Sequence, residues 1–276
     1  MVSKETRQPR YALGHSEREL ERLSTQARAF EPFTRQLLAE AGIEQGMRVL
    51  DVGCGSGDVT FLAAEIVGVD GAVLGVDRAL EAVERARNRA SARRIANVRF
   101  AEGDSAEMDF NREFDAVVGR FVLMYYPDAV AALRKLASRV RGGGLVVFQE
   151  LDEQNCRTIP STPLFARATT WIKSALVSGG ATLQMGLRLY PTFLAAGLPA
   201  PTLRMDSLIE GAPSARTFRL LTDLIETLLP VMEKFGIATR EEAAIATLEQ
   251  RMRDEAVAAN GIVLSPALIG AWARKP

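Results

Sequence analysis

The segment VLDVGCGSGDVT, at residues 49–60, constrains the fold more than any other part of this chain. An apolar run with the composition of a buried strand leads directly into Gly53, Gly55 and Gly57, and then into a helix-like stretch. Glycine lets the backbone turn tightly and lets a ligand approach without a Cβ in the way. The positive end of the following helix faces the same point. The sequence therefore predicts a ligand-binding turn at the carboxyl end of a β-strand.

Short β-branched runs alternate with helical stretches over residues 47–150, which is typical of parallel strands joined by crossover helices. Five runs are rich in Val, Leu, Ile or Phe, as buried parallel strands are: MRVLDV, AVLGVD, NVRFAEG, FDAVVGRF and GLVVFQEL. Pro127 is expected in the first turn of the helix before the last run, and the glycines at 142–144 are expected to end that helix. The predicted fold class is α/β, with a Rossmann-like, doubly wound and mostly parallel sheet.

Helical segments are expected both before and after the sheet-forming region in the sequence. SERELERLSTQARAFEPFTRQLLAEAG predicts two amphipathic helices, with Ser16 as N-cap and Glu19 completing a capping box. Three more helical stretches follow the fifth run, and two β-like runs, PTLRMDSLIEG and GIVLSPALIGAWARK, bracket the last two helices. We expect an N-terminal helical lid over 1–45, a ligand-binding core over 46–152, and completion of the sheet with a C-terminal helical insertion, the substrate cap, over 153–276.

Composition narrows the classes of partner. Lys plus Arg equals Asp plus Glu at 34 each, so the chain lacks the basic footprint of a nucleic-acid-binding protein. No apolar stretch has the length of a membrane span or signal peptide, which predicts a cytoplasmic protein. Cys54 and Cys156 give no disulfide framework, and a single histidine leaves little for a metal site. The expected partner is a small molecule, and the expected state is a monomer or homodimer.

Glycine spacing separates two adenosine cofactors. The loop reads G-x-G-x-G, whereas a dinucleotide fold uses G-x-G-x-x-G, and Asp51 stands where a carboxylate would repel a pyrophosphate. An acidic loop suits S-adenosylmethionine, which carries a sulfonium and an ammonium group. Asp77 ends the second run at the ~20-residue spacing that places an acid on the ribose hydroxyls of either cofactor. An NAD-dependent oxidoreductase therefore stays as the alternative.

Two later loops add candidate cofactor residues. Asp104 and Ser105 follow the third run and could bind the amino edge of adenine, although an Asx or Ser turn would use the same residues. The fourth run ends in VVGRFVLMYYPD, which would bring the backbone of Arg120 and Phe121 alongside the cofactor. Both loops follow the carboxyl ends of strands, where α/β sheets bind their ligands.

Four motifs in order carry a family resemblance: LDVGCGSGD, GVD, GDSAEMDFNREFDAVVGRFVLMYYPD and ALRKLASRVRGGGLVVFQE. They cover residues 49–150 and resemble class I S-adenosylmethionine-dependent methyltransferases of the bacterial small-molecule type. The resemblance implies methyl transfer from S-adenosylmethionine to a small-molecule acceptor. It assigns the methionine part of the cofactor to Asp51, Gly53, Gly55 and Gly57, the ribose to Asp77, the adenine to Asp104 and Ser105, and the flank of the adenosine to Arg78. A non-methylating S-adenosylmethionine-binding module is a further alternative.

The N-terminal YALGHSERELERL with Gln26 resembles a lid segment of some bacterial members, which implies that Tyr11 and Gln26 touch the cofactor. Tyr11 could equally anchor a tail, and Gln26 could be a solvated helix residue. His15 and Glu150 are candidates for a general base if the acceptor is a hydroxyl. His15 could instead cap or precede a helix, and Glu150 could belong to a solvated acidic loop.

Large apolar residues after the fifth run are candidates for an acceptor pocket. Phe165, Trp171, Phe218 and Met232 could line such a pocket, and each fits a helical core position better. The nature of the methylated atom stays open at this point.

Overall fold

A seven-stranded sheet forms the framework of the computed structural model, which describes residues 17–110 and 113–276, with side chains from residue 29 onward. Its order is β3-β2-β1-β4-β5-β10-β7, with β1 to β5 parallel and β10 antiparallel to both β5 and β7. The strands are β1 (Arg48–Val52), β2 (Ala72–Asp77), β3 (Val98–Glu102), β4 (Phe114–Arg120), β5 (Val140–Asp152), β7 (Thr202–Asp206) and β10 (Ala267–Arg274). The predicted Rossmann-like class is confirmed, and the last two β-like runs complete the sheet as an antiparallel pair.

Helices cover both faces of this sheet because successive strand residues point to opposite sides. Val49 packs in the cluster that contains helix residues Leu38 and Leu62, whereas Leu50 packs in the cluster that contains Leu133. The first face carries α1 (Glu17–Ala41) and α2 (Asp58–Val67), with α3 (Leu80–Arg93) beside them over β2 and β3. The second face carries α4 (Ala129–Ser138) and α6 (Met185–Ala195). The central strands β1, β4 and β5 are thus buried on both sides over most of their length, which explains their continuous apolar runs in the sequence.

The N-terminal segment forms one helix where two were predicted. Helix α1 continues through Pro32, which removes one backbone hydrogen bond from the helix interior. Beyond the proline, Leu37 and Leu38 are buried against the sheet, so tertiary packing holds the helix together. The predicted cap at Ser16 and the side chain of Glu19 lie outside the described residues.

The glycines at 142–144 lie inside β5, so the prediction that they end the preceding helix is wrong. Helix α4 ends at Ser138, and β5 begins at Val140. The pairing of β4 with β5 shifts register between Phe114 and Ala116, and a Cβ on Gly144 would lie 2.7 Å from the carbonyl oxygen of Asp115. The glycines thus accommodate a bulge where two backbones approach closely. Pro127 also precedes the N-cap, Asp128, and is not in the first turn.

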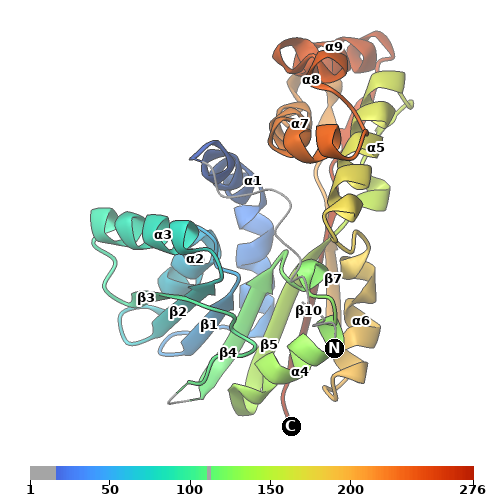
Figure 1. Cartoon of the computed structure of the whole chain (residues 1–276). Helices are drawn as coiled ribbons and strands as arrows, with labels where there is room; N and C mark the ends of the chain where they lie inside the picture. Colours follow the sequence, from blue (N-terminus) through green and yellow to red (C-terminus); the bar gives the residue numbers. More distant parts are fainter. Residues whose placement is uncertain (1–16, 111–112) are drawn as a thin grey trace, which may run out of the picture.

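A second group of elements, which we call the helical lobe, stands beyond one end of the sheet (Figure 1). It comprises α5 (Pro163–Ser178), α7 (Thr217–Lys234), α8 (Arg240–Ala243) and α9 (Ile245–Ala258). A small antiparallel sheet of β6 (Arg157–Ile159), β9 (Ile262–Leu264) and β8 (Ile209–Gly211) links the lobe to β5, β7 and β10. Helix α1 contacts both α2 and α7, so it lies between the two parts of the molecule.

The three helical stretches predicted after the fifth strand are present in the lobe. Helix α6 was missed because Pro191 interrupts its helical pattern. The apolar side of α7 is buried as far as Met232, whereas Phe235 is 51% exposed because the helix ends at Lys234. Among the helices of the described segments, none has the length and apolar composition needed to cross a bilayer.

Candidate functional site: a cavity at the carboxyl ends of the parallel strands

A cavity of about 630 Å³ lies between the carboxyl ends of the parallel strands and the helical lobe. Its volume falls in the range of ~300–1,000 Å³ that small-molecule sites occupy. Residues from strand ends and their loops form one wall, among them Asp51, Gly53, Gly55, Asp77, Arg78, Ser105, Arg120 and Phe121. Residues from the lobe form another, among them Leu176, Gly179, Thr217, Leu220, Leu221 and Leu224. The predicted strand-end residues therefore meet at one site.

The glycine turn fits a ligand that approaches the backbone closely. Gly53 and Gly55 have φ values of +63° and +52° in the left-handed region, which disfavours any residue with a Cβ. A Cβ on Gly53 would lie 2.6 Å from Cγ2 of Val122, whereas a Cβ on Gly55 would meet no atom within 4 Å. Gly55 therefore faces the open cavity. Gly57 is not part of the lining; it is the N-cap of α2, also at positive φ.

Asp77 connects the glycine turn to the start of α3. Its Oδ2 accepts a hydrogen bond from the backbone amide of Gly55 at 2.8 Å, and its Oδ1 accepts one from the amide of Ala79 at 2.9 Å. An ionised carboxylate has about four acceptor positions, so two stay available for the hydroxyls of a ligand. The geometry is therefore compatible with the predicted ribose role.

Asp51 supplies a buried acid beside the glycine turn. It is 1% exposed, and this burial raises its pKa to about 7, against the opposing effects of a 2.6 Å hydrogen bond from Thr60 Oγ1 and of the Arg120 guanidinium. An acid with such a pKa carries a fractional negative charge at neutral pH. A cationic group bound in the cavity would favour the ionised form.

Arg120 fixes helix α1 to the sheet at the edge of the cavity. Its guanidinium donates to Thr34 Oγ1 at 3.0 Å, and the Thr34 hydroxyl donates to Gln149 Oε1 at 2.7 Å. Nearby, the rings of Phe30 and Phe121 meet edge to face with centroids 6.1 Å apart. Phe30 lines the cavity, although no sequence motif distinguished it from other apolar residues of the helix.

Asp104 lies behind the cavity wall and holds two residues that form it. Its Oδ2 pairs with Arg78 at 2.5 Å, and its Oδ1 accepts from Tyr126 Oη at 2.9 Å and from the amide of Ala106 at 3.0 Å. The Arg78 guanidinium also lies over the Tyr126 ring, 4.7 Å from its centroid. Arg78, Ser105 and Tyr126 line the cavity, whereas Asp104 does not. The bond to Ala106 is the Asx turn that was the alternative to adenine binding.

Glu150 binds the backbone of the turn that follows β4. It is fully buried, and its Oε1 accepts hydrogen bonds from the amides of Val122 at 2.9 Å and Leu123 at 2.7 Å. Burial raises its pKa to about 7. The turn includes Phe121, whose φ of +58° is unusual for a residue with a side chain. Glu150 is absent from the cavity lining, so it holds Phe121 and Val122 in place and does not face a ligand.

Glu153 is the acid that sequence reasoning missed. It belongs to a short 3-10 helix, η2 (Glu153–Asn155), directly after β5, and it lines the cavity at 4% exposure. The sequence had pointed to Glu150, and the next acid along β5, Asp152, caps η2 by accepting a hydrogen bond from the amide of Gln154. The position of Glu153 depends on η2, and no sequence motif predicts this short helix.

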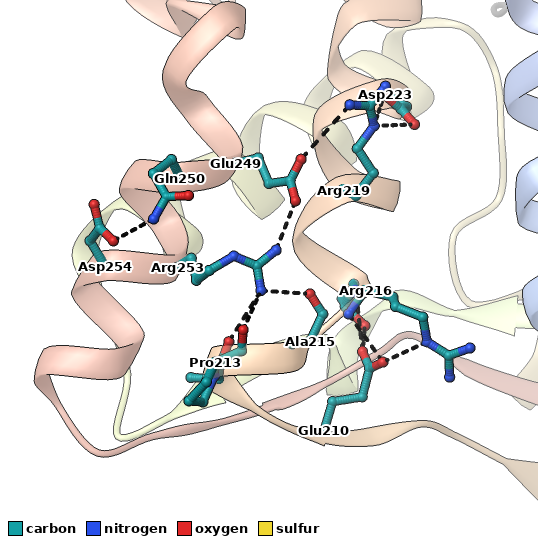
Figure 2. Close-up of polar contacts among 12 residues, drawn as sticks. Glu210, Pro213, Ala215, Arg216, Arg219, Asp223, Glu249, Gln250, Arg253 and Asp254 are labelled. Atoms are coloured by element: carbon teal, nitrogen blue, oxygen red, sulfur yellow. Dashed lines mark hydrogen bonds and ion pairs between the residues drawn. The ribbon is translucent and has the colours of Figure 1, made fainter.

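The wall formed by α7 is anchored at its first turn. Glu210 accepts from the backbone amides of Arg216 and Thr217 and from Thr217 Oγ1, the last at 2.6 Å. Figure 2 shows this carboxylate together with Arg253, which donates to the carbonyl oxygens of Pro213 and Ala215 at 3.1 Å each and pairs with Glu249. These contacts set the position of Thr217 at the cavity.

Several predicted residues lie elsewhere. Tyr11 and His15 fall outside the described residues, and Gln26 lies in α1 with its side chain outside them. The apolar candidates Phe165, Trp171, Phe218 and Met232 are all buried in the core and absent from the lining, as the helical spacing favoured. The apolar wall of the cavity is formed instead by leucines of α5 and α7.

Comparison with known proteins identifies the family. The family model described as a methyltransferase domain matches residues 43–189, more than half of the chain. The chain belongs to this methyltransferase domain family. Its membership confirms the resemblance to class I S-adenosylmethionine-dependent methyltransferases.

Individual relatives agree with this methyltransferase domain. The aklanonic acid methyltransferase DauC of Streptomyces sp. strain C5 is 36% identical over 120 residues, which are 43% of this chain and 54% of that enzyme. A demethylmenaquinone methyltransferase of Staphylococcus aureus is 31% identical over 132 residues, 48% of this chain and 52% of that enzyme. The chain thus spans about half the length of these curated relatives. The YcgJ protein of Bacillus subtilis shares the fold, with a TM-score of 0.57 at 17% identity over 88% of this chain and 99% of that protein.

Proposed function

We propose that this protein is an S-adenosylmethionine-dependent methyltransferase that acts on a small-molecule acceptor. The observation that carries the proposal is the continuity of the cavity. The same cavity reaches from the glycine turn and Asp77 to the leucines of α5 and α7. A polar wall suited to an adenosyl cofactor and an apolar wall suited to an acceptor thus face the same cavity.

The polar wall matches the chemical groups of S-adenosylmethionine. Gly55 offers close approach to the backbone, and Asp51 offers negative charge to the ammonium and sulfonium groups. Asp77 retains acceptor capacity for the two ribose hydroxyls. Arg78 and Ser105 line the part of the cavity that would take the adenine, and Asp104 fixes Arg78 there.

When bound, the cofactor supplies an activated methyl group. Transfer is an in-line displacement, so the protein has to orient the acceptor and exclude water. Orientation alone contributes about 7–11 kcal/mol to such reactions. Helix α1, through Phe30, and helix α7, through its leucines, close the cavity from two sides. This arrangement supports a lid role for residues 1–45 and an acceptor-binding role for residues 153–276, around a core at 46–152.

The lobe wall favours an acceptor with a substantial apolar part. Leu176, Leu220, Leu221 and Leu224 border the cavity there. The names of the two curated relatives specify aklanonic acid and demethylmenaquinone as the molecules that those enzymes methylate. For the present protein we infer a small, partly apolar acceptor.

Calorimetric titration with S-adenosylmethionine, S-adenosylhomocysteine and NAD tests the proposal. We expect both adenosyl ligands to bind in a one-to-one ratio and NAD to give no heat. Binding of NAD alone would favour the oxidoreductase alternative. A screen with labelled methyl groups then separates a methyltransferase from a protein that binds the cofactor without transferring its methyl group.

A further inference from the structure

Glu153 differs from the other acids at or beside the cavity. The carboxylates of Asp51, Asp77 and Glu150 each accept hydrogen bonds from the protein, from Thr60, Gly55 and Val122 among others. Among the described residues, no hydrogen bond reaches the carboxylate of Glu153, although the residue is 4% exposed. Burial of an ionisable group without a partner costs free energy unless a ligand supplies one. The cavity is the place from which such a partner can come.

The surroundings of Glu153 shift the pKa of its carboxyl group toward neutral pH. Burial raises its pKa to about 7, the negative charge of Asp152 acts in the same direction, and the charge of Lys173 on α5 opposes both. The neighbouring thiol of Cys156 is neutral because burial raises its pKa well above the ordinary value. A carboxyl group with a pKa near the working pH is well matched to proton transfer.

The location of Glu153 associates it with the acceptor. It follows β5, whereas the candidate cofactor residues Asp51 and Asp77 lie in the carboxyl-terminal parts of β1 and β2, and Ser105 follows β3. The apolar wall comes from α5 and α7, and α5 also carries Lys173, whose charge acts on Glu153. Glu153 is thus a carboxylate on the acceptor side of a mainly apolar space.

On the basis of the proposed methyl transfer, we propose that Glu153 accepts the proton of the acceptor's reacting hydroxyl group, and that the acceptor is an apolar molecule that presents one such hydroxyl. The hydroxyl oxygen forms a bond to the methyl carbon while the bond from that carbon to sulfur breaks. Both electrons of the broken bond stay on sulfur, and the hydroxyl proton passes to the Glu153 carboxylate. One positive and one negative charge disappear together. A cationic amine would instead form a stable ion pair with the carboxylate and have no free electron pair for attack.

A kinetic test uses 2-naphthol, an apolar molecule with one hydroxyl, as the acceptor probe. For wild type we expect formation of the methyl ether, with kcat rising with pH around a midpoint near 7, because only ionised Glu153 accepts the proton. Glu153→Gln should lower kcat by roughly 100-fold or more and flatten the pH profile. KM for 2-naphthol and affinity for S-adenosylhomocysteine should change about threefold or less. Glu153→Asp keeps a carboxylate and should retain an intermediate kcat with a pH dependence.

The matched control is Glu241→Gln, which removes one carboxylate from the exposed surface of α8 and should leave kcat unchanged. An unchanged kcat in Glu153→Gln would overturn the proposal, even if the wild type methylates 2-naphthol. Failure of wild type to bind S-adenosylhomocysteine would instead count against the proposed function. Failure of wild type to bind 2-naphthol, with S-adenosylhomocysteine bound, would overturn the acceptor class.

A second measurement does not depend on turnover. Carbon-13 NMR of Glu-labelled protein, with Glu153→Asp used to assign the signal, follows the carboxyl carbon in the S-adenosylhomocysteine complex. We expect a titration midpoint well above the ordinary range of glutamate and a change of the signal when 2-naphthol is added. An ordinary midpoint, or a signal that 2-naphthol leaves unchanged, would overturn the role of Glu153.

Discussion

Asp77 accepts a hydrogen bond from the backbone amide of Gly55, with its Oδ2 2.8 Å from the amide nitrogen. The proposed ribose acid therefore also holds the shape of the glycine turn. Asp77→Ala should weaken binding of S-adenosylhomocysteine by about 10- to 100-fold, as for loss of a hydrogen bond to a charged group. Melting temperature should fall slightly, because two backbone amides lose their acceptor. Calorimetry and thermal unfolding measure both effects, with the exposed Asp70→Ala as control. Unchanged affinity in Asp77→Ala would refute the ribose assignment.

Two glycines of the same turn should respond differently to alanine. Gly55→Ala strains a left-handed backbone but adds a methyl group to open space, so we expect lost ligand affinity with a moderate loss of stability. Gly53→Ala adds a clash with Val122 and should lower both affinity and melting temperature more strongly. Thermal unfolding without ligand separates the pair. Equal melting temperatures for the two variants would contradict the assigned geometry.

Raised pKa values predict a protein that is less stable at alkaline pH. Burial raises the pKa values of Asp51, Glu150 and Glu153 to about 7, so the folded state holds protons that the unfolded state has released. This contribution is full below the unfolded values near 4 and is lost as pH rises through about 7. Melting temperature without ligand should therefore fall by several degrees between pH 5.5 and 8. Glu150→Gln keeps an acceptor for Val122 and should reduce this fall; an unchanged slope would argue against an ionisable Glu150.

Arg253 should affect the acceptor side of the cavity without affecting the cofactor side. Its guanidinium holds the carbonyl oxygens of Pro213 and Ala215 next to the first turn of α7. Arg253→Ala should loosen α7, raise KM for 2-naphthol and lower the melting temperature, with unchanged affinity for S-adenosylhomocysteine. The control is Arg219→Ala, which removes an exposed arginine from α7 itself. A parallel loss of S-adenosylhomocysteine affinity in Arg253→Ala would show that the two sides are not independent.

The parts of the fold that sequence predicts well are those in which local and global preferences agree. The central strands β1, β4 and β5 contain continuous apolar runs because both of their faces are buried. The glycine turn requires positive φ values, which only glycine adopts readily. The glycines at 142–144 were misassigned because helix ends and β-bulges favour the same residue for different reasons. Helix α6 was missed because Pro191 cannot donate a backbone hydrogen bond and so argues against a helix in the sequence. In the folded protein, packing of α6 in the core outweighs the loss of that hydrogen bond.

Candidate site residues divide in a similar way. Asp51, Gly55 and Asp77 could be located from sequence because each lies within a motif of fixed spacing at a strand end. Phe30, Leu220 and Glu153 could not, since their place at the cavity depends on how α1, α7 and η2 pack against one another. Asp104 shows the intermediate case: the motif found the right loop, and Arg78 and Tyr126 occupy the carboxylate that was expected to face the ligand.

The route of the chain between β7 and β10 has a consequence for how the proposed methyltransferase can change its acceptor. The whole stretch from β8 to β9 leaves the large sheet and returns to it at β10, which pairs with both β5 and β7. Exit and return thus lie on neighbouring strands at one edge, distant from the glycine turn between β1 and α2. Insertions, deletions or exchange of α7 to α9 leave the strands that carry Asp51 and Asp77 intact. Replacement of this one continuous stretch could therefore change the acceptor that the protein binds, while the residues proposed to bind the methyl donor are retained.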